Sequence, residues 1–152
     1  MEQYPAQPPM QTPNPHYRHA VEQCFLHAAF ISDIGMRLID CGPGWAESML
    51  EIAPRHLQHT GIVHAGVQTT LADHTGGCAA MTLAGAEDTV LTVEFKMHLL
   101  RAGKGESLWC RAQVLKPGSK FSIVESEVHA LSDGRKTLVS KLIGTMAILP
   151  RQ

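Results

Sequence analysis

Residues 89–99 carry the pattern that most constrains how this 152-residue chain can fold. Apolar and polar side chains alternate there with a strict period of two, which is typical of a β-strand that buries one face. We therefore predict a strand whose apolar side chains point to a core and whose polar side chains point to solvent. The apolar set is Leu91, Val93, Phe95, Met97 and Leu99, and the polar set is Thr92, Glu94, Lys96 and His98.

Similar patterns predict five further strands and two helices, separated by turns rich in glycine and proline. One helix is expected at 16–32, where apolar side chains recur at three- and four-residue steps. The other is expected at 65–84, with Gly85 as its stop signal. The further strands are expected at 36–40, 45–53, 108–114, 121–131 and 136–149.

A largely antiparallel sheet has to cover its apolar face with another element. The only segment long enough is 65–84, and its glycines and alanines give it a slim profile that suits a curved sheet. We therefore predict an α+β fold, an antiparallel curved sheet wrapped around one long central helix, within a single domain of residues 16–152. Five of the nine prolines lie in residues 1–15, which we predict to be a flexible tail.

Composition excludes several classes of function. The net charge is −1 and the basic residues are scattered, so nucleic acid is not an expected partner. No apolar run approaches the ~18 residues of a transmembrane helix, and no secretory signal is visible, so no membrane partner is expected. The four cysteines are widely spaced and form no CxxC, which indicates reduced thiols and a cytoplasmic protein.

The stretch GIVHAGVQTTLADHTGG, residues 61–77, contains one carboxylate in an otherwise uncharged run. Asp73 is either an exposed helix residue or a carboxylate held in a dry site, where a raised pKa suits a general base. The amides of Ala65 and Gly66 fall at the expected helix start and can receive a developing oxyanion. His64 immediately precedes them.

The spacing of His64 and Asp73 predicts a second chain at the site. Nine residues at ~100° and ~1.5 Å each place the two side chains on opposite sides of one helix and ~13 Å apart along it. They cannot easily serve one reacting atom within one chain. Antiparallel helices of two chains could bring them together, so we predict a dimer with composite sites.

These residues resemble the hotdog-fold acyl-CoA thioesterases of the phenylacetate-pathway type. That family has Asn or Gln, then G-x-x-H-G-G, then Asp or Glu nine residues past the histidine. The matching residues are Gln58, Gly61, His64-Ala65-Gly66 and Asp73, and the strand TVEFKMHLLRAGKG follows. The resemblance covers about residues 28–149, and it implies a hotdog fold for the predicted sheet and helix.

The resemblance also implies roles for individual residues. Asp73 would be the general base or nucleophile, and the amide of Ala65, with Gly66 beside it, would polarise the thioester carbonyl. The residues expected to position substrate or water are Gln58, His64 and Thr92. No metal or other cofactor is expected, since the spacing of His56, His59, His64 and His74 fits no zinc signature.

The implied substrate is an acyl- or aryl-CoA thioester, and the implied assembly is a homodimer, often paired into a tetramer. Candidate cations for the CoA phosphates are Arg101, Lys104, Lys116 and Lys120. The chain departs from the family at three places: Ala65 replaces a glycine, Gln58 stands where many members have Asn, and Arg101-Ala102-Gly103 replaces the usual Pro-Ala. The first two concern substrate size and rate, and not the fold.

Two other functions are compatible with the same fold. Ala65 and Gln58 leave open a non-catalytic acyl-CoA binder or regulator. A hydratase or dehydratase is the other, but relatives with that chemistry place their His and Asp differently on the helix. The nine-residue spacing therefore favours thioester hydrolysis over hydration.

Overall fold

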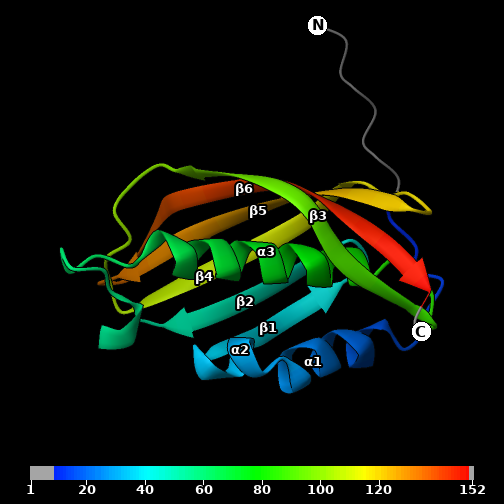
Figure 1. Cartoon of the computed structure of the whole chain (residues 1–152), viewed down its shortest axis with the longest axis horizontal. Coiled ribbons are helices and arrows are strands. Elements are labelled where there is room, and N and C mark those ends of the chain that lie inside the picture. Colours follow the sequence, from blue (N-terminus) through cyan, green and yellow to red (C-terminus); the bar gives the residue numbers. More distant parts are fainter. Residues whose placement is uncertain (1–8, 151–152) are drawn as a thin grey trace, which may run out of the picture.

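A computed structural model describes residues 9–150 and contains one six-stranded antiparallel sheet wrapped around a long helix, α3 (Figure 1). The sheet order is β1-β2-β4-β5-β6-β3. The helices are α1 (Tyr17–His27), α2 (Ala29–Asp33) and α3 (Ala65–Met81), with a 3-10 turn η1 at Pro54–His56. The strands are β1 (Met36–Gly42), β2 (Trp45–Glu51), β3 (Asp88–Leu99), β4 (Ser107–Lys116), β5 (Phe121–Ser132) and β6 (Arg135–Pro150). The predicted fold class, an antiparallel curved sheet wrapped around one long central helix, is confirmed.

Helix α3 lies close against the inner face of the sheet because its contact positions are small. A Cβ atom on Gly76 would lie only 3.1 Å from Val124 and Ser126 of β5. The Ser126 hydroxyl donates a 2.8 Å hydrogen bond to the Ala72 carbonyl, and Ser48 and Thr75 hydroxyls are 2.5 Å apart. Helix and sheet are thus joined by short polar contacts as well as by apolar packing.

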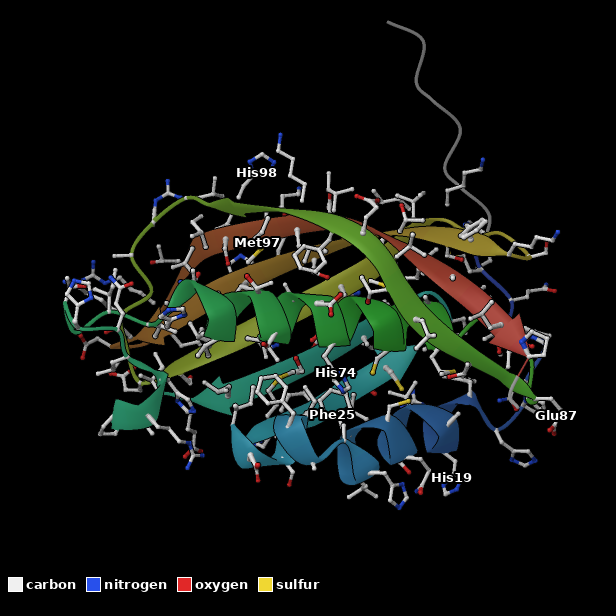
Figure 2. All side chains as sticks on the ribbon, in the orientation of Figure 1. His19, Phe25, His74, Glu87, Met97 and His98 are labelled. Carbon is white, nitrogen blue, oxygen red and sulfur yellow. The ribbon has the colours of Figure 1, made fainter. Side chains whose placement is uncertain are left out.

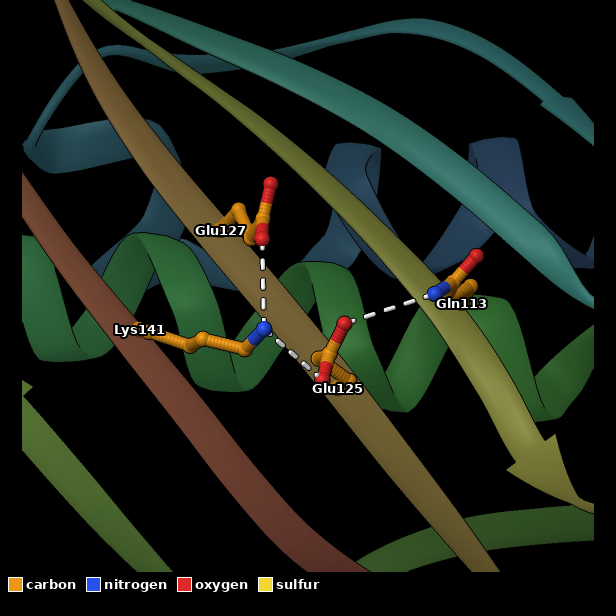
Figure 3. A network of polar contacts seen from close by, with 4 residues as sticks. All are labelled: Gln113, Glu125, Glu127 and Lys141. Atoms are coloured by element: carbon orange, nitrogen blue, oxygen red, sulfur yellow. Dashed lines mark hydrogen bonds and ion pairs between the residues drawn. The ribbon is translucent and has the colours of Figure 1, made fainter. Parts of the chain in front are cut away.

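The outer face of the sheet is charged where the inner face is apolar. The Lys141 ammonium lies 3.0 Å from Glu125 and 3.2 Å from Glu127, and Gln113 donates to Glu125 (Figure 3). These side chains come from β4, β5 and β6 and keep one face of the three strands hydrated. Among residues 9–150, no helix is long and apolar enough to cross a bilayer.

The helix expected at 16–32 is two helices. The helical conformation is interrupted at Ala28, whose backbone is extended (φ −83°, ψ 93°). In one continuous helix, Phe25 and Ile31 would lie about 120° apart around the helix axis. With the helix interrupted between them, both side chains are buried. Residues 1–8 of the expected tail lie outside the described residues, whereas Asn14 is buried and Met10 packs against the core.

Strand β3 departs from the strict alternation that its sequence predicts. Thr92 pairs with Met146 of β6, but the next pair is Glu94 with Thr145, so Val93 is an extra residue in a β-bulge. The bulge reverses the parity of the strand. Thr92 therefore faces α3 together with Met97, and Leu91 faces outward with Glu94. The prediction that all the apolar side chains of this strand share one face is wrong.

Candidate functional site

Asp73 lies in the middle of α3 and points toward β3. Its Oδ1 accepts a 2.8 Å hydrogen bond from the Thr92 hydroxyl. Burial of the carboxylate raises the pKa of Asp73, and the Thr92 hydrogen bond partly opposes this by lowering it. No cation forms an ion pair with Asp73 within residues 9–150. A half-buried carboxylate without a counter-ion is suited to accept a proton.

The bulge in β3 is what brings Thr92 to Asp73. In a regular strand with Val93 at an ordinary pairing position, Thr92 and Met97 would be five positions apart, and a strand that kept Met97 over the core would turn Thr92 to the outer face. A bulge next to an active site often re-aims a side chain in this way. The sequence pattern does not predict it, because Val93 is itself apolar and fits the period of two.

A cavity of about 110 Å³ adjoins Asp73 and Thr92. Its remaining lining is mainly apolar and comes from α1, α3 and β3. The side chains that complete it include Cys24, His74, Cys78, Met81 and Val90. Such a lining excludes water from part of the Asp73 carboxylate, which explains why its pKa is raised.

His74 lines the same cavity. The sequence gives it no catalytic role and includes it only among the histidines whose spacing fits no zinc signature. Its ring meets Phe25 of α1 edge-on, with 4.6 Å between ring centroids (Figure 2). Its Nε2 is buried and has no hydrogen-bond partner in the part of the chain that the structure describes. Burial lowers the pKa of His74 to about 4, so its imidazole is neutral at physiological pH.

At the other end of the site, His64 is the N-cap of α3. Its Nδ1 accepts a 2.8 Å hydrogen bond from the Gly66 amide, which requires Nδ1 to be unprotonated. The ring fits because residue 66 has no side chain: a Cβ there would lie 3.0 Å from Nδ1. The Gly66 amide is therefore occupied, whereas the Ala65 amide has no acceptor within residues 9–150. Of the two amides, that of Ala65 can therefore receive a further acceptor.

Two cavities flank the start of α3. One, of about 350 Å³, is lined by His64 and Gly66 and by Phe30, Arg55 and Thr70 among others. The other, of about 340 Å³, is lined by Ala65 and by Gln58, Gln68, Leu99 and Arg101 among others. In the first, His64 lies beside Gly66 and Thr70, whereas Asp73 adjoins a different cavity.

The predicted site residues are thus divided among three cavities in one chain. Asp73 and Thr92 share one, His64 and Gly66 share another, and Gln58 and Ala65 share the third. Ala65 and Asp73 are eight residues apart, or about 12 Å along the helix axis. A single thioester group cannot reach both within one chain, which agrees with the separation expected from the sequence.

The four candidate CoA cations lie at opposite ends of the sheet. Arg101 is next to the Ala65 cavity, and its guanidinium donates a 3.1 Å hydrogen bond to the Leu138 carbonyl. Lys104 is exposed in the same loop. Lys116 and Lys120 flank the β4–β5 turn, near the far end of β6, where the Lys120 carbonyl accepts from Ile148.

His56, one of the histidines considered for a metal, is occupied by backbone contacts. Its Nδ1 accepts from the Ala53 amide at 2.9 Å, and its Nε2 lies 2.8 Å from the Ile34 carbonyl. It is buried and holds η1 against the end of α2. Its two ring nitrogens therefore have structural partners.

Comparisons with known proteins agree with this geometry. The profile of the family described as "Thioesterase superfamily" matches residues 60–137. A provisionally named esterase of Saccharolobus solfataricus is 30% identical over 131 residues, which is 86% of this chain and 91% of the relative. The crystal structure of a thioesterase family protein from Silicibacter pomeroyi is 30% identical with a TM-score of 0.86, covering 88% of this chain and 98% of that one.

The PaaI protein from the phenylacetic acid degradation operon of E. coli has the same fold. It is 16% identical with a TM-score of 0.81, covering 93% of this chain and 99% of that one. At this identity the likeness concerns the fold alone.

Proposed function

Because the chain belongs to the thioesterase superfamily, we propose that this thioester hydrolase acts on an acyl- or aryl-CoA thioester, with Asp73 as its general base or nucleophile. The observation that carries the proposal is the environment of Asp73. The carboxylate is half-buried, has a raised pKa, accepts a hydrogen bond from Thr92 and adjoins a mainly apolar cavity. A structural carboxylate in such a place would normally have a cation partner.

In the general-base route, a water oxygen bonds to the thioester carbon while the Asp73 carboxylate takes the water proton. The carbonyl oxygen becomes negative and is held by the Ala65 amide at the positive end of α3. The carbon–sulfur bond then breaks, and the CoA sulfur leaves with the proton from Asp73. In the nucleophilic route, an Asp73 oxygen bonds to the carbon and the carbon–sulfur bond breaks, so that CoA leaves as a thiolate that takes a proton from water. A second water then hydrolyses the resulting mixed anhydride and frees the acid and the Asp73 carboxylate.

The route needs Ala65 and Asp73 from different chains, and the free edge of β3 supports such a dimer. This 12-residue edge strand exposes Leu91, Val93 and Phe95 by 55%, 56% and 40%. An uncovered apolar edge of that length is a template for pairing with another chain. The other edge strand, β1, is shorter and is covered by α1. We therefore assign the dimer contact to β3; a tetramer of such dimers remains a prediction.

A cytoplasmic location belongs to the same proposal. The four cysteines form no disulfide with one another, as expected for a protein kept in a reducing compartment. A CoA thioester substrate also places the reaction where CoA is made and used.

The experiment that tests the proposed function is free-thiol release from short, medium, long and aryl CoA thioesters. Wild type and Asp73→Asn are compared, with the exposed Glu87→Gln as the matched control (Figure 2). We expect Asp73→Asn to lose at least about 100-fold in kcat and the control to keep wild-type activity. Tight binding of CoA thioesters without turnover by wild type would instead identify a non-catalytic binder.

Single turnover in oxygen-18 water separates the two routes. Label in the Asp73 carboxylate identifies the nucleophilic route, because hydrolysis of the anhydride can place solvent oxygen on the enzyme. Label in the product acid alone is the result expected of the general-base route.

A further inference from the structure

Gln68 is a buried amide beside the start of α3 that the proposed mechanism does not use. Its side chain lies one helical turn after Ala65 and is only 3% exposed. It lines the same cavity of about 340 Å³ as Ala65. Its Oε1 is buried and has no hydrogen-bond partner among the described residues. A buried acceptor in this state is uncommon in folded proteins and calls for an explanation.

The orientation of the Gln68 amide is fixed by its other atom. Nε2 donates a 3.4 Å hydrogen bond to the Val63 carbonyl. If the amide were rotated to exchange Nε2 with Oε1, Oε1 would face the Val63 carbonyl oxygen, and both atoms are acceptors. Gly103 packs against the same group: a Cβ there would lie 3.2 Å from Nε2. The amide is therefore held with its donor toward the backbone and its acceptor unpaired.

Among the described residues, the lining of this cavity includes one donor without an acceptor and one acceptor without a donor. They are the Ala65 amide and Gln68 Oε1, on two residues that lie about 4.5 Å apart along the helix axis. Leu99 and Leu100 supply apolar lining between these groups and Arg101. A complementary ligand has a carbonyl oxygen and, a few bonds away, an N–H group on an otherwise apolar chain.

A CoA thioester has this arrangement at its reacting end. Its carbonyl carbon is followed by the sulfur, two methylenes and the first amide N–H of the pantetheine arm. We propose that Gln68 is a substrate-binding residue whose Oε1 accepts a hydrogen bond from this N–H while the Ala65 amide holds the thioester carbonyl. This inference rests on the proposed function and adds the residue that orients the leaving group.

The site should therefore require an amide N–H at this point of the substrate. A linker of the same length without the N–H should not be enough. A site built to bond an N–H group rejects an isostere that lacks it, because the buried acceptor is then left unpaired. Past this amide, the arm would pass Arg101, which is exposed beside the same cavity.

The test uses two thioesters of the acyl group that the CoA panel identifies as best. One is the N-acetylcysteamine thioester, which retains the N–H. The other is the 2-acetoxyethyl thioester, in which an ester oxygen replaces that N–H. We expect wild type to prefer the first by about tenfold or more in kcat/KM. Gln68→Met, which keeps the length without the acceptor, should bring the ratio close to one.

Gln113→Met on the outer face of the sheet is the matched control and should keep the wild-type ratio. A structural effect of Gln68→Met would lower both rates together and leave their ratio unchanged. A wild-type ratio near one, or a ratio that survives in Gln68→Met, overturns the inference while leaving thioester hydrolysis in place. If neither compound nor any CoA thioester is hydrolysed, the proposed function fails and the inference fails with it.

Discussion

The Thr92 hydroxyl of β3 donates a 2.8 Å hydrogen bond to the Asp73 carboxylate of α3, across the junction between the edge of the sheet and its central helix. The contact joins residues 19 positions apart, and it exists because a bulge at Val93 turns Thr92 inward. It both orients the carboxylate and holds its pKa below the value that burial alone would give. The predictions below concern this pair, the helix start, the neighbouring histidine and the edge strand.

Thr92→Val should shift the pH dependence of hydrolysis. Asp73 must be ionised to act as base or nucleophile, so activity rises as pH rises through its pKa. Removing the hydrogen bond that lowers this pKa raises it further, and the acidic limb of the kcat/KM profile should move to higher pH. We also expect kcat on the plateau to fall about tenfold, because the carboxylate is less well oriented. Thr92→Ser should retain the wild-type pH profile. An unchanged acidic limb in Thr92→Val would show that the Thr92 hydrogen bond does not lower the pKa of the catalytic group.

Ala65→Pro should remove the oxyanion donor without breaking the helix. Proline is favoured at the first position of a helix, and His64 already has the extended backbone (φ −61°, ψ 140°) that a residue before proline prefers. The substitution deletes one N–H that has no acceptor among residues 9–150. We expect kcat to fall about 100- to 1000-fold while circular dichroism stays unchanged. Near-normal kcat in a folded variant would exclude the Ala65 amide as the donor.

Mixing two inactive variants should restore activity if each site uses two chains. In a mixed dimer of Ala65→Pro and Asp73→Asn, both defects fall in one site and the other site is intact. Co-refolded equal amounts should recover up to about a quarter of wild-type activity, because half of the dimers are mixed and each has one working site. Ala65→Pro mixed with itself is the control. Recovery no greater than in that control would indicate a site within one chain.

His74 should destabilise the fold at mildly acidic pH. Its pKa is lowered to about 4 in the folded chain, so between about pH 6.5 and 4 the unfolded chain binds a proton that the folded chain does not. The free energy of unfolding should therefore fall as pH falls through this range, by up to about 3 kcal/mol from this residue. The raised pKa of Asp73 acts in the opposite direction, because the folded chain takes up that proton first.

The difference between wild type and His74→Gln isolates the histidine, since Asp73 is present in both. His74→Gln should show a shallower loss of stability between pH 6.5 and 4 in urea denaturation. His19→Gln, whose side chain is 71% exposed, should behave as wild type (Figure 2). Parallel curves for wild type and His74→Gln would show that His74 is protonated equally in both states.

A charge at the edge of β3 should separate the proposed dimer. Phe95→Lys replaces an apolar side chain, 40% exposed beside the free edge, with a charged one. We expect light scattering to show a monomer and thiol release to fall with it. Ile39→Lys on β1, at the opposite edge and 41% exposed, should leave assembly and activity unchanged. A dimer in both variants would show that the dimer contact does not lie at β3.

The sequence predicts much of the fold through local periodicity. The strands, their turns and the central helix follow from side-chain spacing and from glycine and proline positions. The break at Ala28 and the bulge at Val93 do not follow, because both depend on which distant residues pack against the segment. Ala28 itself is an ordinary helix former, and Val93 continues the alternation.

The residues of the candidate site are likewise predicted only in part by the sequence. Asp73 stands out in the sequence as the one carboxylate in an apolar run, and its spacing from Ala65 follows from the rise of the helix. Gln68 and His74 give no comparable signal, because a buried polar atom is recognised only when its partners are known. The cap that Nδ1 of His64 makes to the Gly66 amide likewise needs the actual path of the backbone.

The sequence by itself determined a sheet around a helix, with Asp73 in the middle of that helix and Ala65 near its start, because these depend on contacts a few residues apart. Only the tertiary structure decided that Thr92 meets Asp73 and that, within the described part of the chain, the Ala65 amide and Gln68 Oε1 have no hydrogen-bond partner. Those features depend on strand register and on helix capping. Each is fixed by the free energy of packing the whole chain and not by the preference of any one segment.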